Sequence, residues 1–289
     1  MARSIYIASP NAGTGKSTVA LGLVSCLTKV VAKVGVFRPF VESREGDAFL
    51  SLLLNRAGST TPPEQCVGAT WDEFHADPEE ALARIVDAYR AMAREHDVVI
   101  IDGSDFTDVA GNPELALNAR VAANIGVPVL LVVSGQNDVE DVVASVEVSM
   151  AEIADNHART VAVVANKCLP ETRQAVGEAL TAIEGITSTT LPEVPLLAAP
   201  VVREVLDAVE GTLIAGDETL LDREAESVLV CAMDVSHVLE RLTAGQLAIV
   251  PADRSAMLIS LMAAQASSSF PILSGLILNG GFEVAPHAL

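Results

Sequence analysis

The chain has 289 residues, of which half are hydrophobic and only 3% aromatic, and its formal net charge is −20. A surface this acidic repels nucleic acids and anionic lipids, so we expect neither as a partner. The four cysteines are far apart, so neither a zinc site nor a disulfide framework is implied, and scattered free thiols fit a reducing cytoplasm. No apolar run approaches the roughly 18 residues of a membrane helix.

The first two thirds of the chain alternate between strand-like and helix-like segments. Short runs rich in Val, Ile and Leu, typical of strands buried in a parallel sheet, lie at residues 4–8, 33–37, 97–102, 127–133 and 160–165. Segments with helical periodicity lie between them, at 16–29, 79–95, 113–124, 138–154 and 171–183. This alternation predicts an α/β fold, a mostly parallel sheet with helices on both faces.

A second, smaller α/β domain is expected after a proline-rich stretch. Three prolines lie within residues 191–200, and a predicted helix at 201–210 ends at Gly211, so we place the first domain at 1–215 and the second at 216–289. The second domain is predicted to contain helices at 223–241 and 255–266 and strands at 247–250 and 275–278. Two strands leave a sheet short of partners, so we expect this domain to be incomplete at its C-terminus.

A glycine-rich segment follows the first predicted strand. Gly15-Lys16-Ser17 matches the end of the phosphate-binding pattern G-x-x-x-x-G-K-[ST], although Pro10 stands where the first glycine is expected. Gly13 and Gly15 allow the backbone to turn its N–H groups onto phosphate, Lys16 would reach the terminal phosphates, and Ser17 would place its hydroxyl on Mg²⁺. The predicted phosphate site comprises Gly13, Thr14, Gly15, Lys16, Ser17 and Thr18. The alternative is a glycine-rich turn that binds no ligand.

Two further polar residues follow predicted strands. Asp102 ends the strand at 97–102, and an acid at that end of a buried strand points into the crevice where ligands bind in open α/β sheets. We interpret Asp102 as a direct or indirect ligand of Mg²⁺, with a helix-capping or loop acid as the alternative. Asn166-Lys167 follows the strand at 160–165 and could hydrogen-bond a purine edge, or could simply begin a loop.

Together with Arg38-Pro39 and Asp47-Ala48, these residues resemble dethiobiotin synthetase and its relatives over roughly residues 3–215. The resemblance implies that ATP or another purine nucleotide binds with Mg²⁺. It also implies that Ser17, Asp47 and Asp102 hold the metal ion and that Asn166 contacts the purine. The loop at 103–108 lacks the glycine-rich sequence that binds substrate in that family. The nucleotide half of the family pattern is therefore retained, whereas the substrate half is not.

A closer resemblance covers the whole chain. It is carried by residues 34–39, 191–200, 247–254 and 276–281, which are similar to the N-terminal region of long-form bacterial phosphate acetyltransferase. That region joins a dethiobiotin-synthetase-like domain to a DRTGG domain, whose name-giving motif is represented here only by Asp253-Arg254-Ser255. The resemblance implies a cytoplasmic, regulatory region that senses a nucleotide or metabolite and assembles into homo-oligomers. Its partner would be a C-terminal transferase domain that carries acetyl transfer, so we assign no catalytic residue to this chain.

Two other functions stay open. A free-standing ATP-dependent ligase of the dethiobiotin synthetase type shares the phosphate loop, but the altered substrate loops count against it. A partition-type switch ATPase has the pattern K-G-G-x-G-K-[ST], which residues 11–17 approach. Asn11 in place of the first lysine and the acidic surface count against this function.

Overall fold

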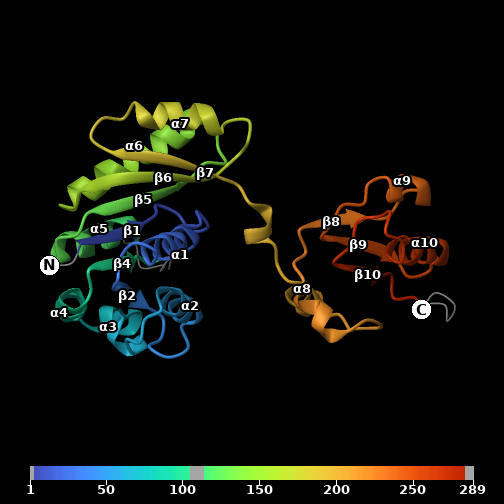
Figure 1. The fold of residues 1–289 in the computed structure, drawn as a ribbon, viewed down its shortest axis with the longest axis horizontal. Coiled ribbons are helices and arrows are strands. Elements are labelled where there is room, and N and C mark those ends of the chain that lie inside the picture. The colour runs from blue at the N-terminus through green and yellow to red at the C-terminus, as the bar shows by residue number, and fades with distance from the viewer. Residues whose placement is uncertain (1–2, 105–113, 284–289) are drawn as a thin grey trace. The chain divides into compact units, whose positions relative to one another are not determined.

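The computed structural model describes residues 3–104 and 114–283, which belong to two compact units, Met1–Glu193 and Val194–Leu289. In the first unit, seven parallel strands form one sheet in the order β3-β2-β4-β1-β5-β6-β7 (Figure 1). The strands are β1 (Arg3–Ala8), β2 (Val34–Val41), β3 (Val67–Thr70), β4 (Val98–Asp102), β5 (Val129–Ser134), β6 (Thr160–Cys168) and β7 (Thr187–Pro192).

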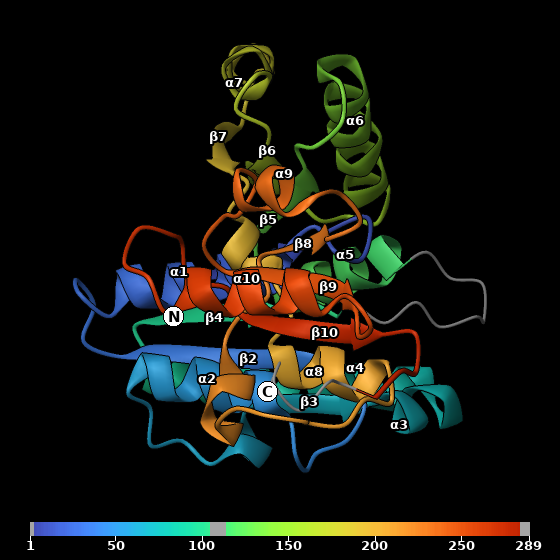
Figure 2. The same ribbon diagram turned by 90° about the vertical axis from the view of Figure 1, so that its right-hand side faces the viewer.

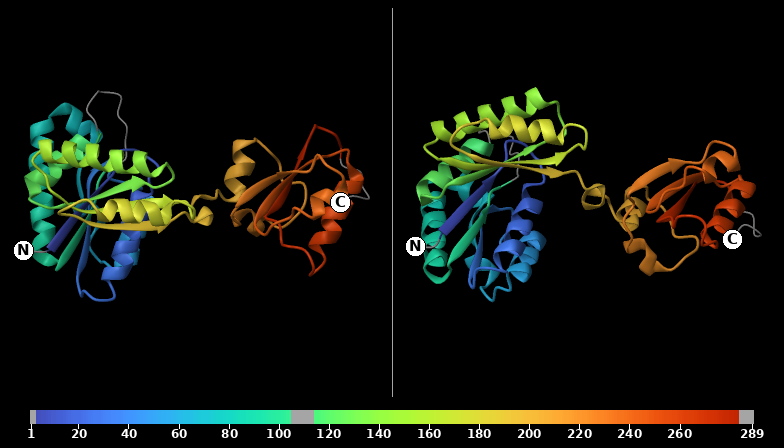
Figure 3. Two further views of the ribbon diagram at one scale, coloured as in Figure 1. Left: turned by 90° about the horizontal axis from the view of Figure 1, so that it is seen from above. Right: turned by 45° about the horizontal axis from the view of Figure 1, so that its top comes forward.

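Helices cover both faces of this sheet (Figure 3). They are α1 (Lys16–Leu27), α2 (Ala48–Ala57), α3 (Trp71–Ala76), α4 (Pro78–Glu95), α5 (Glu114–Ile125), α6 (Val139–Asp155) and α7 (Arg173–Thr181), with a short 3₁₀ turn, η1 (Pro63–Gln65). Helix α1 packs beside α2, and α4 to α7 pack one beside the next. The chain runs from β1 out to β3 and then back across to β7, so right-handed crossovers put these two groups on opposite faces. The predicted α/β fold is confirmed.

The two edge strands of the sheet were not predicted from the sequence. Strand β3 has only four residues, and β7 has the sequence Thr-Ser-Thr-Thr-Leu-Pro, which contains no apolar run. Both become strands because a central strand offers its backbone groups, β2 to β3 and β6 to β7. The central strands match the prediction better, since Val99, Ile100 and Ile101 of β4 are fully buried.

The sheet changes direction at the neighbouring strands β1 and β4. Strand β1 leads into α1 and β4 leads toward α5, which lie on opposite faces, and ligands of open α/β sheets bind at such a point. The register pairs Ile7 of β1 with Asp102 of β4, and Phe37 of β2 with Ile101. The loop after β1, Asp102 and Arg38 are therefore brought to the same end of the sheet.

The second unit has a three-stranded parallel sheet in the order β10-β9-β8. Its elements are η2 (Pro195–Ala198), α8 (Val202–Ala208), η3 (Glu218–Asp222), β8 (Ser227–Val230), α9 (Val235–Leu239), β9 (Gln246–Pro251), α10 (Ser255–Gln265) and β10 (Gly275–Asn279). Side chains of α9 and α10 pack on one face of the sheet, and Figure 2 shows α10 along β9 and β10.

The predicted helix at 223–241 is wrong. Residues 227–230 pair with β9 as strand β8, and only the five residues of α9 are helical. Val228 and Val230 favour a strand once a partner strand is available, and that partner lies some twenty residues further along the chain. The described residues of this unit accordingly form three strands rather than the two that the sequence predicted.

The compact units divide between Glu193 and Val194, earlier than the boundary predicted between residues 215 and 216. The backbone N–H of Val202 donates to the Arg223 carbonyl and that of Ala225 donates to the Pro200 carbonyl, both at 2.8 Å. These bonds join the start of α8 to the segment before β8. Across the described ranges, no helix is long and apolar enough to span a bilayer.

Candidate functional site

The glycine-rich segment forms a tight loop between β1 and α1. Gly13 and Gly15 have φ angles of 76° and 80°, in the left-handed region that favours glycine, and Gly15 is the N-cap of α1. A Cβ atom at Gly15 would lie 2.3 Å from Nδ2 of Asn166, so the backbone approaches that side chain closely. The Thr14 hydroxyl is buried and makes no hydrogen bond to the residues that the structure describes. The positive φ angles give the tight turn expected of these glycines, and phosphate binding by the loop stays a prediction.

Two side chains from the end of β6 hold this loop in place. Nδ2 of Asn166 donates a hydrogen bond to the Thr14 carbonyl at 2.8 Å, and Nζ of Lys167 donates one to the Gly13 carbonyl, also at 2.8 Å. Lys167 itself has a φ of 60°, an uncommon conformation for a residue with a side chain. The predicted purine contact of Asn166 stays a prediction, because here its amide group supports the phosphate loop. The contact of Lys167 was not predicted.

Lys16 is turned toward the end of β4 and is buried. Its Nζ atom donates to Oδ1 of Asp102 at 2.7 Å and to the carbonyl oxygen of Gly103. The side chains of Lys16 and Asp102 are 1% and 0% exposed. A buried charge is costly unless it is paired, so the strand acid and the loop lysine stabilise one another in this structure.

The predicted metal ligands occupy different positions at the same end of the sheet. Ser17 is half-buried in the first turn of α1, where Thr18 is exposed. Asp47 caps α2, accepting a hydrogen bond from Leu50 N at 2.8 Å. No cluster of three or more His, Cys, Asp or Glu side chains suited to a metal ion occurs within residues 3–104 and 114–283.

Arg38 links the two acids predicted to bind metal. Its Nη1 atom forms an ion pair with Oδ2 of Asp47, and its Nε atom lies 3.4 Å from Oδ2 of Asp102. The Arg38 side chain is only 11% exposed. Arg38 belongs to one of the motifs in the sequence but had no predicted role, although its position just after a predicted strand was the available signal.

A buried polar network fixes the chain just after Asp102. Asn118 of α5 accepts at Oδ1 from the Tyr6 hydroxyl at 2.6 Å and from the Ser104 backbone N–H at 3.0 Å. Burial raises the pKa of Tyr6 well above its usual value, and the nearby charges of Asp102 and Glu114 raise it further. This network was not predicted, and it holds the Gly103 carbonyl where Lys16 reaches it. Residues 105–108 of the loop that the sequence singled out lie outside the described residues.

The donor set fits a polyphosphate with a divalent cation. The loop offers the left-handed glycines and the buried Thr14 hydroxyl, Lys16 supplies a positive charge, and Asp47 and Asp102 supply carboxylate oxygens, the ligands that Mg²⁺ prefers. These residues fit the phosphates and the metal ion, but none of them is placed to distinguish one nucleotide base from another.

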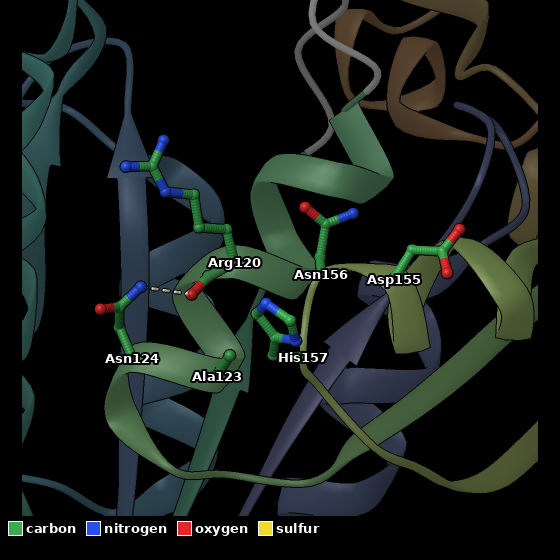
Figure 4. Close-up of a pocket in the computed structure, with 6 residues that line it drawn as sticks. All are labelled: Arg120, Ala123, Asn124, Asp155, Asn156 and His157. Carbon is green, nitrogen blue, oxygen red and sulfur yellow. Dashed lines mark hydrogen bonds between the residues drawn. The ribbon is translucent and has the colours of Figure 1, made fainter.

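A shallow pocket of about 420 Å³ lies elsewhere in the first unit, lined by residues that include Arg120, Asn124 and His157 (Figure 4). It is formed where α5 and α6 end, next to the beginnings of β5 and β6, whereas the glycine-rich loop follows the end of β1. The pocket and the loop therefore lie at opposite ends of the strands. Arg120 is engaged with Glu79 at 2.7 Å. None of the predicted site residues lines this pocket, so it is separate from the phosphate site.

Comparison with known proteins also divides the chain into two domains, with a boundary between that of the compact units and the predicted one. Residues 3–205 match the AAA domain family, and residues 204–289 match the DRTGG domain. The chain is 27% identical to a phosphate acetyltransferase of Nitratidesulfovibrio vulgaris and 25% identical to one of Synechocystis. In both cases the alignment covers 99% of this chain but 43% of the relative, so the chain spans less than half the length of these curated relatives.

Two solved structures are similar to part of the chain, each with a TM-score below 0.5. A putative plasmid partition protein of Borrelia burgdorferi, bound to AMPPNP, has a TM-score of 0.49 and 14% identity, and covers 75% of this chain and 93% of its own. The septum site-determining protein MinD of Pyrococcus horikoshii, complexed with Mg-ADP, has a TM-score of 0.43 and 19% identity, covering 68% and 84%. The family matches decide membership: the chain belongs to the AAA domain family, continues into a DRTGG domain, and corresponds to a part of phosphate acetyltransferases that is consistent with their N-terminal region.

Proposed function

We propose that this chain is a nucleotide-binding regulatory region of a phosphate acetyltransferase, the enzyme that converts acetyl-CoA and phosphate into acetyl phosphate and CoA. The observation that carries the proposal is the phosphate site, in which the loop at Gly13 and Gly15, the buried Lys16 and the acids Asp47 and Asp102 meet at one end of the sheet. The relatives that match almost the whole chain are phosphate acetyltransferases, which supports the assignment to that enzyme. Acetyl transfer itself would belong to the part of those proteins that this chain does not span.

In this proposal, ATP with Mg²⁺ binds at the loop, and its binding changes the activity of the attached transferase. The change in activity would be a coupling free energy between two distinct sites, which requires that the nucleotide bind two states of the whole protein with different affinities. On binding, the Lys16 ammonium group would leave the Asp102 carboxylate and pair with phosphate oxygens, because it can pair with either anion.

Calorimetric titration of the chain with MgATP tests the nucleotide part. We expect binding to the wild-type chain and at least tenfold weaker binding to Lys16→Ala, since the phosphate contact of one charged group is worth about 1.5–3 kcal/mol. Circular dichroism of both proteins controls for folding. A folded wild-type chain that gives neither heat nor a thermal shift with MgATP would overturn the proposal.

The regulatory part is tested on a complete phosphate acetyltransferase that contains this region. We expect nucleotide to change its acetyl-transfer rate, and we expect removal of residues 1–289 or the Lys16→Ala change to abolish that response. The same rate and the same response with and without the region would contradict a regulatory role.

We further propose that the region assembles as a homo-oligomer through its second unit. Val228 and Val230 of β8 are 58% and 59% exposed and, two residues apart in a strand, share one face, which offers a small apolar surface to a second copy of the chain. Light scattering should report a mass above 30.1 kDa for wild type and a lower mass for Val228→Thr/Val230→Thr. A monomeric wild-type chain would refute this assembly.

A further inference from the structure

Two buried side chains, Lys16 and Asp102, and two half-buried ones, Arg38 and Asp47, form a single row of alternating charge. Lys16 contacts Asp102 at 2.7 Å, Asp102 lies 3.4 Å from Nε of Arg38, and Arg38 pairs with Asp47. The side chains are 1%, 0%, 11% and 13% exposed in that order. Two positive and two negative charges leave the row neutral, which is the condition under which buried charges are tolerated.

Arg38 occupies the central cationic position of this row. Its backbone is fixed in β2, where its N–H donates to the Cys66 carbonyl at 2.8 Å, and its guanidinium lies 5.8 Å from the centre of the Phe49 ring. Asp47 is equally fixed, because its Oδ1 atom caps α2 while its Oδ2 atom pairs with Arg38. The guanidinium has several donors in a planar fork, which lets it join two carboxylates where a single ammonium could not.

The same two carboxylates are the oxygen ligands available to a divalent cation in the crevice. A divalent cation that enters alone adds two positive charges beside Lys16 and Arg38 and must break the pairs they make. A polyphosphate that enters alone adds negative charge beside Asp47 and Asp102. When both enter together, Lys16 and Arg38 gain phosphate oxygens as the carboxylates turn to the cation, so each charge keeps a partner.

We propose that Arg38 competes with the divalent cation for Asp47 and Asp102, so that the site takes up cation and polyphosphate together and neither one alone. This inference rests on the proposed nucleotide binding and adds to it a mechanism for coupling the two ligands. Arg38 acts here as a positioning residue that holds the carboxylates of Asp47 and Asp102 in place until the cation replaces it.

The wild-type chain tests the joint uptake without any substitution. Calorimetry is run with ATP in EDTA, with Mg²⁺ alone, and with ATP and Mg²⁺ together. We expect ATP to bind at least about tenfold more tightly with Mg²⁺ than in EDTA, within the usual range of coupling between two ligands, and we expect no resolved binding of Mg²⁺ alone. Equal ATP affinity with and without Mg²⁺ would overturn the inference while leaving nucleotide binding intact.

The competition is tested with Arg38→Met in the absence of nucleotide. Removing the guanidinium leaves two carboxylates with one cation, so we expect Mg²⁺ alone to bind at least about tenfold more tightly than to wild type, detected by calorimetry and by a thermal shift. Arg56→Met is the matched control, because it removes the same charge from an exposed position of α2. We expect that control to leave Mg²⁺ binding unchanged.

A second variant covers the case in which Arg38→Met does not fold. Arg38→Lys retains the charge but not the fork, so we expect a smaller rise in affinity for Mg²⁺ alone, between those of wild type and Arg38→Met. A folded Arg38→Met or Arg38→Lys chain with wild-type affinity for Mg²⁺ would refute the competition. If ATP does not bind with or without Mg²⁺, the proposed nucleotide binding is rejected. The comparison of Mg²⁺ affinity between wild type and the Arg38 variants does not depend on nucleotide binding.

Discussion

Nζ of Lys16 lies 2.7 Å from Oδ1 of Asp102, and both side chains are buried. This contact joins the loop after β1 to the end of β4, two segments that lie 86 residues apart in the sequence. In this structure the strand acid therefore holds the lysine of the glycine-rich loop.

The Lys16–Asp102 pair should show a large coupling in a double-mutant cycle. Lys16→Met removes one partner of a buried pair, so we expect it to lower the free energy of unfolding by about 3–5 kcal/mol. Asp102→Asn combined with Lys16→Met removes both charges, and the double variant should lose less stability than the sum of the single changes. Urea denaturation measures all four proteins, and additive losses would show that the pair contributes no coupling.

The two left-handed glycines of the loop should differ in their tolerance of alanine. Gly13→Ala and Gly15→Ala both place a side chain at a positive φ, which costs of the order of 1 kcal/mol or more. Only Gly15→Ala also meets Nδ2 of Asn166 at 2.3 Å, whereas nothing lies within 4 Å of a Cβ at Gly13. We expect Gly15→Ala to lower both the melting temperature and MgATP affinity more than Gly13→Ala does, and equal effects would exclude a role for the close approach.

Asn166 can be tested as a support of the loop rather than a reader of the base. Asn166→Ala leaves the buried Thr14 carbonyl without its 2.8 Å hydrogen bond, a loss of about 1–3 kcal/mol of stability. If Asn166 acts through the loop, the substitution weakens binding of MgATP and of magnesium tripolyphosphate by the same factor. A loss confined to MgATP would support the purine contact. Lys167→Met, which removes the bond to Gly13, serves as the companion variant.

Glu73 should make the stability of the first unit depend on pH in the acid range. The Thr70 backbone N–H donates to its carboxylate at 2.9 Å, and this bond, aided by Arg44 and Arg84, lowers the pKa of Glu73 below its usual value. Because the folded-state pKa is depressed, the contribution is present above the unfolded value of about 4.3 and is lost as the pH falls through the lower folded value. The stability difference between wild type and Glu73→Gln should therefore be constant near neutral pH and shrink below about pH 4. A difference that does not change with pH would contradict the assignment.

The four cysteines should divide into one reactive and three protected thiols. Cys26 is exposed, whereas Cys66, Cys168 and Cys231 are buried. Burial, with the charge of Glu64, raises the pKa of the Cys66 thiol to about 11, and burial also raises the pKa of Cys168 and of Cys231. Since the thiolate is the reactive form, an aromatic disulfide reagent at pH 8 should modify about one thiol per folded chain and all four after denaturation. Cys26→Ser should abolish the reaction of the folded chain with this reagent.

The sequence by itself determined the class of the fold and the position of the glycine-rich loop. Local signals suffice for both, because apolar strands such as 97–102 are buried whatever their partners, and a glycine-rich turn before Lys16 has few possible conformations. Asp102 was found for the same reason, since the end of a parallel strand opens on the crevice.

Only the tertiary structure decided which side chains meet in that crevice. The pairing of Ile7 with Asp102 and of Phe37 with Ile101 depends on the register of β1, β4 and β2, and that register places Arg38 between two acids. In the same way, β8 is a strand because β9 pairs with it, although its own sequence was taken for helix. Such contacts are stabilised by residues that are distant in the chain, so a local sequence pattern does not predict them.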